Sequence, residues 1–103
     1  MNIRISKLYV GGPHACVEVA FNRDPSGSEM IGRIIEATGQ PFARPPANRH
    51  ALRELHLARI ADPTELDRVY KLARSIAADY GIVHDSQKEM QGPDDVAYTR
   101  GGA

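Results

Sequence analysis

The chain contains no tryptophan and only one cysteine, Cys16, among its 103 residues. A single cysteine cannot form an internal disulfide, and it suits a reducing compartment such as the cytosol. No apolar run approaches the roughly 18 residues of a membrane-spanning helix. The first seven residues alternate between polar and apolar types, unlike a signal or transit peptide. We therefore expect a soluble, cytoplasmic protein with no membrane partner.

Net charge is also absent, because 13 Lys and Arg side chains balance 13 Asp and Glu side chains. A neutral chain lacks the overall basic field that general nucleic-acid binders carry. The balance is uneven along the chain: residues 1–61 hold eight basic and five acidic side chains, whereas residues 62–103 hold five and eight. Arginine outnumbers lysine ten to three, and with frequent alanine this favours a bacterial or phage origin.

No catalytic or phosphate-binding motif is complete. The segment Gly11-Gly12-Pro13 separates two predicted strands, whereas phosphate-binding glycine loops lead from a strand into a helix. His14 and Cys16 lie two residues apart and are the candidates for a reactive Cys/His pair or for metal ligands. No orienting third group, oxyanion donor or second ligand pair accompanies them. We expect a hairpin turn with a passive cysteine, no metal, no cofactor and no enzymatic activity; catalysis by His14 and Cys16 is the alternative.

Residues 2–22 predict an antiparallel hairpin. In its second half, Val17, Val19 and Phe21 alternate with less apolar neighbours, the period of a half-buried strand. In the first half the apolar alternation slips at Ser6-Lys7, which predicts a β-bulge.

Two segments have the periodicity of helices. Residues 26–39 begin with the spacing of a capping box, Ser26 and Glu29, and end at a glycine and a proline. The second helix is predicted from an N-cap at Asp62 to a terminal Gly81, with apolar side chains at i, i+3, i+4 and i+7.

Residues 51–61 fit either a strand or a helix. Leu55 and Leu57 alternate with polar neighbours as in a strand, while the composition favours a helix. We prefer the strand because it can lead directly into the N-cap at Asp62.

These elements predict an α+β fold in the order ββαβα, with ββααα as the alternative. Residues 82–83 add a short edge strand. We expect residues 1–84 to form one domain and residues 85–103, which lack an apolar pattern and end in glycines, to form a flexible tail.

An arginine-rich connector, residues 44–53, is the strongest functional feature. The candidate contact residues in and beside it are Phe42, Arg44, Arg49, His50 and Arg53. Guanidinium groups bind phosphate and carboxylate through paired hydrogen bonds, and a proline-stiffened loop presents them well. We expect a small adaptor or inhibitor that occupies a protein partner; the alternative is nucleic-acid or nucleotide binding through residues 44–53. A homodimer, formed through the tyrosines of the last helix or through sheet edges, is a further alternative.

Overall fold

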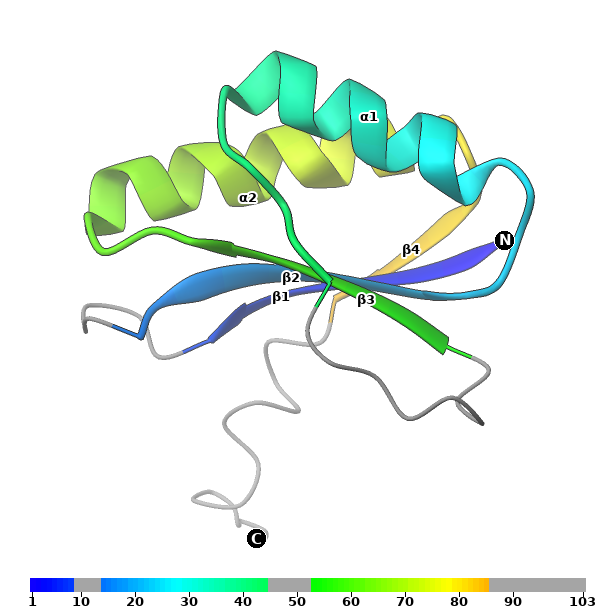
Figure 1. Cartoon of the computed structure of the whole chain (residues 1–103), viewed down its shortest axis with the longest axis horizontal. Coiled ribbons are helices and arrows are strands. Elements are labelled where there is room, and N and C mark those ends of the chain that lie inside the picture. Colours follow the sequence, from blue (N-terminus) through cyan, green and yellow to red (C-terminus); the bar gives the residue numbers. More distant parts are fainter. Residues whose placement is uncertain (9–13, 45–52, 86–103) are drawn as a thin grey trace, which may run out of the picture.

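A computed structural model describes residues 1–8, 14–44 and 53–85 (Figure 1). These residues form β1 (Asn2–Leu8), β2 (Cys16–Asn22), α1 (Gly27–Thr38), β3 (Arg53–Arg59), α2 (Pro63–Ala77) and β4 (Ile82–Asp85). The predicted α+β fold is confirmed, including the strand at residues 53–59 and the edge strand after the last helix. Beyond Asp85, the last residue of β4, the predicted tail lies outside the described residues.

The four strands form one mixed sheet in the order β3-β2-β1-β4. The predicted hairpin is confirmed by the antiparallel pairing of β1 with β2, and β2 pairs antiparallel with β3 on its other side. Since β4 pairs parallel with β1, α2 has to cross the sheet from one edge to the other. Ala43, which lies outside the named strands, forms an isolated antiparallel bridge with Leu57 of β3.

Both helices pack on the same face of the sheet (Figure 1). We call the opposite face, which no described helix covers, the open face, although Ser6, Cys16 and Ala20 on it are buried. Alternation along the strands assigns to it Asn2, Arg4, Ser6, Leu8, Cys16, Glu18, Ala20, Asn22, Arg53, Leu55, Leu57, Arg59, Ile82 and His84. Neither described helix is long and apolar enough to span a bilayer.

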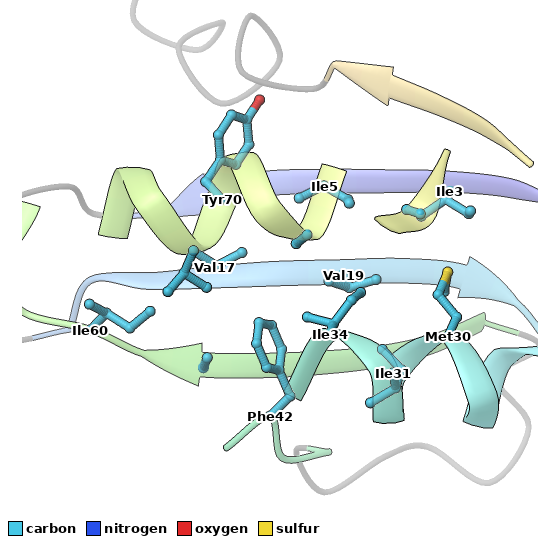
Figure 2. Packing of buried hydrophobic residues seen from close by; sticks show 14 of the residues in the cluster. Ile3, Ile5, Val17, Val19, Met30, Ile31, Ile34, Phe42, Ile60 and Tyr70 are labelled. Carbon is cyan, nitrogen blue, oxygen red and sulfur yellow. The ribbon is translucent and has the colours of Figure 1, made fainter. Parts of the chain in front are cut away.

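The hydrophobic core lies between the helices and the sheet (Figure 2). Ile3, Ile5 and Val19 are fully buried on the helix-facing side of β1 and β2, where they meet Met30 and Ile34 of α1. These isoleucine and valine positions alternate as the sequence predicts. Burying side chains of this size contributes about 1.5–3 kcal/mol each, so this layer supplies most of the driving force for folding.

The slip at Ser6-Lys7 is not a bulge, so that prediction is wrong. The register between β1 and β2 continues without interruption from Ile3 to Leu8. Lys7 occupies a core-facing position, where its Nζ lies 4.9 Å from the ring centroid of Tyr70 and 3.3 Å from Oδ1 of Asp67. A lysine can take such a position because its methylene stem packs against apolar surface while the ammonium group finds polar partners.

The helix ends follow the predictions in part. Asp62 caps α2 as predicted, since its Oδ2 accepts a hydrogen bond from the Glu65 amide at 2.9 Å. Ser26 makes no side-chain capping bond; its hydroxyl instead donates to Oδ1 of Asp24 at 2.6 Å, so the predicted capping box is wrong. The last helix ends at Ala77, before Gly81, because tight turns there replace the helical hydrogen bonds.

Candidate functional site

The structure separates the predicted contact residues of the arginine-rich connector. Phe42 packs in the hydrophobic core with 8% of its surface exposed, whereas Arg44, two residues further along, is exposed. Arg53 opens β3 and projects from the open face. Arg49 and His50 lie outside the described residues. The connector's described arginines therefore belong to different surroundings, and only Arg53 joins a defined cluster of polar side chains.

Cys16 is buried while His14 is exposed, and no hydrogen bond joins these two described residues. Burial raises the pKa of the Cys16 thiol; the neighbouring Glu18 carboxylate raises it further, and Arg59 acts in the opposite direction. A raised thiol pKa and poor access both disfavour the thiolate that nucleophilic attack and metal binding require.

Another histidine, His56, takes a structural position on the helix-facing side of β3. Its ring stacks on Phe21 with the ring planes 2° apart and the centroids 5.7 Å apart. Its Nε2 lies 3.2 Å from Oε1 of Glu54, so packing and a carboxylate fix the imidazole. Within residues 1–8, 14–44 and 53–85, no three His, Cys, Asp or Glu side chains converge as metal ligands.

The pairing register arranges the open face in rows that cross the strands. The first two rows, from β3 to β4, are Arg53, Asn22, Asn2 and Ile82, followed by Leu55, Ala20, Arg4 and His84. Beyond them lie Leu57, Glu18 and Ser6 in the third row and Arg59, Cys16 and Leu8 in the fourth. Cross-strand neighbours of this kind are close enough for their side chains to interact.

A pocket of about 360 Å³ opens at the first two rows. The described residues that line it are Asn2, Ile3, Arg4, Phe21, Asn22, Arg53 and His84. Ile3 and Phe21 direct their side chains into the core, so they contribute backbone to the pocket, and the other five side chains are polar or basic. Inside the pocket region, Nε2 of His84 donates to Oδ1 of Asn2 at 3.2 Å.

Of the pocket residues, sequence analysis identified only Arg53. Asn2 and Arg4 lie more than 40 positions before Arg53, and His84 lies near the end of the described chain. A sequence pattern that predicts strands does not give their order in the sheet, and that order alone brings these four side chains together.

Comparison of the chain with protein-family models, curated proteins and solved structures finds no match. The function therefore has to be inferred from the residues themselves.

Proposed function

We propose that this chain is a small non-enzymatic binding protein, of adaptor or inhibitor type, that occupies a protein partner with the open face of its sheet. The observation that carries the proposal is the placement of exposed apolar surface. Only two large apolar side chains are exposed among the described residues, Leu55 at 37% and Ile82 at 65%, and both lie on the open face. Covering apolar surface with a partner gains roughly 25 cal/mol per Å².

The charges around these side chains indicate the chemistry of the partner. Arg53 and Arg59 stand on β3 at either end of Leu55 and Leu57, and Glu18 is the only acid on the described part of the open face. Arginine is enriched at protein interfaces, where a polar rim surrounds an apolar centre. The partner surface that complements this face has apolar side chains opposite Leu55 and Ile82, which lie on the two edge strands, and acidic side chains opposite the arginines.

Nucleic acid is the alternative partner, and the excess of arginine on the open face favours it. Proteins that read single-stranded nucleic acid stack the bases on aromatic side chains. The open face carries no Phe or Tyr within the residues described, so a protein fits it better. The two partners differ in salt dependence, because binding of nucleic acid weakens steeply as salt displaces counterions.

A photo-crosslinking residue at position 55 tests the proposal in cells of the organism that encodes the chain. The matched control carries the same residue at position 36, because Glu36 is exposed on α1, on the other side of the molecule. We expect a protein adduct from position 55 that position 36 does not give. Nucleic-acid adducts would favour the alternative, adducts between two copies would indicate a homodimer, and the same adducts from both positions would refute a partner site on the open face.

The purified adduct protein then allows an affinity measurement. Leu55→Lys is expected to weaken its binding at least tenfold, because the substitution places an ammonium group within the apolar contact. Glu36→Lys is expected to change the affinity less than twofold. A protein partner also predicts a shallow dependence on salt, whereas a steep one would support the nucleic-acid alternative.

A further inference from the structure

We infer that the protein partner inserts one acidic side chain, an Asp or a Glu, into the pocket at the first two rows of the open face. This inference rests on the proposed function, because the ligand is a side chain of the same partner. It adds the place where that partner is anchored and the chemical group that anchors it.

The pocket lies between the two apolar side chains of the proposed partner contact. Leu55 is on β3 and Ile82 on β4, which are the two edge strands of the sheet. Asn22 and Asn2 line the pocket from β2 and β1, the two strands between those edges. Neighbouring strands lie about 4.8 Å apart, so the two edges are separated by roughly 14 Å. A partner that contacts both apolar side chains therefore extends over the pocket and closes it from solvent.

Arg53 and Asn22 supply hydrogen-bond donors to the pocket. They form the last cross-strand pair between β2 and β3, and both are exposed on the open face. The Cβ atoms of directly opposed residues lie about 4.5–5.5 Å apart, so the two side chains can reach the same ligand group. The guanidinium fork donates two parallel hydrogen bonds to a carboxylate, and the NH₂ group of the carboxamide can donate another.

The guanidinium group of Arg53 is available to a ligand. It makes no hydrogen bond or ion pair with another residue of the described part of the chain. Arg4 also lines the pocket, but it already interacts with another group. Among the described lining arginines, Arg53 is therefore the one that can bind a ligand without giving up a contact.

The charge and the size of the pocket favour an acidic side chain. One available guanidinium matches the single negative charge and the two oxygens of a carboxylate. An uncharged side chain of the partner would close the pocket and leave the Arg53 charge buried without a counter-charge, which is strongly unfavourable. The volume of about 360 Å³ lies within the range of small-molecule sites, so a whole side chain has room to enter.

NMR titration of the full chain tests the pocket without the partner. The probes are the α-amides of N-acetylglutamate and N-acetylglutamine, which have nearly the same shape but differ in charge, at low ionic strength. We expect the glutamate probe to shift the side-chain N–H signals of Arg53 and Asn22 and to bind at least tenfold more tightly than the glutamine probe. Equal binding of the two probes, or no shift of these signals at millimolar concentration, would overturn the inference.

Arg53→Gln has a matched control in Arg59→Gln. Both arginines are exposed on the same face of β3, but the described lining of the pocket includes only Arg53. We expect Arg53→Gln to weaken binding of the glutamate probe and of the crosslinked partner at least tenfold, and Arg59→Gln to weaken each less than threefold. Equal losses would mean that the two arginines act only through their general charge, and would refute an anchor in the pocket.

The failure of this inference differs from the failure of the proposed function. A protein adduct from position 55 whose affinity does not change in Arg53→Gln would refute the acidic anchor and leave the partner contact standing. The same adducts from positions 55 and 36, together with tight binding of the glutamate probe at Arg53, would refute the partner site but not the affinity of the pocket for a carboxylate.

Discussion

The aromatic ring of Phe21 occupies the space that a side chain on Gly27 would need. Phe21 ends the core-facing side of β2, and Gly27 is the first residue of α1, so their contact sets how closely the helix approaches the sheet. Any larger residue at position 27 has to displace a buried ring.

Gly27→Ala is therefore expected to destabilise the fold by about 1–3 kcal/mol, the usual cost of overpacking a core. Gly32→Ala in the same helix is the control, because a Cβ there meets no atom within 4 Å. It is expected to stabilise the fold by up to about 1 kcal/mol, since glycine is the poorer helix former. Urea denaturation measures both, and equal shifts would contradict the packing of Phe21 against Gly27.

Replacing Phe42 tests whether this residue serves the core or a partner. Phe42 is buried against the side chains of α1 (Figure 2), so Phe42→Ala is expected to cost about 3–5 kcal/mol of folding free energy. Arg44→Ala, two positions along and exposed, is expected to stay within about 0.5 kcal/mol of the parent chain. If thermal unfolding shows Phe42→Ala to be as stable as the parent, the side chain is a surface contact after all.

The loss of folding stability at acid pH is expected to depend on Glu65. Hydrogen bonds from Arg68, and then from Gln40, lower the pKa of the Glu65 carboxyl from 4.5 to about 2. The pKa of Glu65 is lower in the folded chain than in the unfolded chain. The ionised carboxylate therefore stabilises the fold fully above about pH 4.5, and this stabilisation is lost as the pH falls towards about 2. The ionised carboxylate thus joins α2 to the end of α1 at neutral pH.

Glu65→Gln is expected to lower the melting temperature at pH 7 and to flatten its dependence on pH between 4.5 and 2. Glu36→Gln is the control, since that side chain is exposed on α1 and has no hydrogen bond to another described residue. If the melting temperature of Glu65→Gln depends on acid pH in the same way as that of the parent chain, the bonds to Arg68 and Gln40 contribute nothing to stability.

Cys16 is expected to resist thiol reagents in the folded protein. Its burial both raises the pKa of the thiol and blocks access, so modification at neutral pH should run on the order of a hundredfold more slowly than in denaturing urea. A colorimetric thiol assay gives both rates. Rapid modification of the folded chain would support the alternative in which His14 and Cys16 form a reactive pair.

Local patterns predicted most of the fold. The alternation of Val17, Val19 and Phe21 and the helical spacing after Asp62 each reflect which side of an element is buried, and both are confirmed. The errors arise where a polar side chain finds an unusual partner. Lys7 packs over Tyr70 at a core-facing position, and its polar side chain there gives the sequence pattern of a bulge. The Ser26 hydroxyl, which was expected to cap α1, instead donates to the carboxylate of Asp24.

The candidate site could not be predicted in the same way. Leu55 and Leu57 identify β3 as a strand, but whether helices cover their side of it depends on the crossing of α2. The pocket depends further on the parallel pairing of β4 with β1, which places His84 beside Arg4. Such long-range pairing has no local signature in the sequence.

The pairing of β4 with β1 also has a consequence for how the chain folds. His84 and Asn2 are hydrogen-bonded although they lie 82 positions apart, and the amide of Ile82 donates to the carbonyl of Met1 at 2.9 Å. The pairing closes the longest loop among the described residues. It contributes little stabilising free energy until α2 has formed and crossed the sheet. Contacts of such high sequence separation slow folding, so docking of β4 is expected to be the late, rate-limiting step. In hydrogen exchange, the amides of β4 would then open before those of β2.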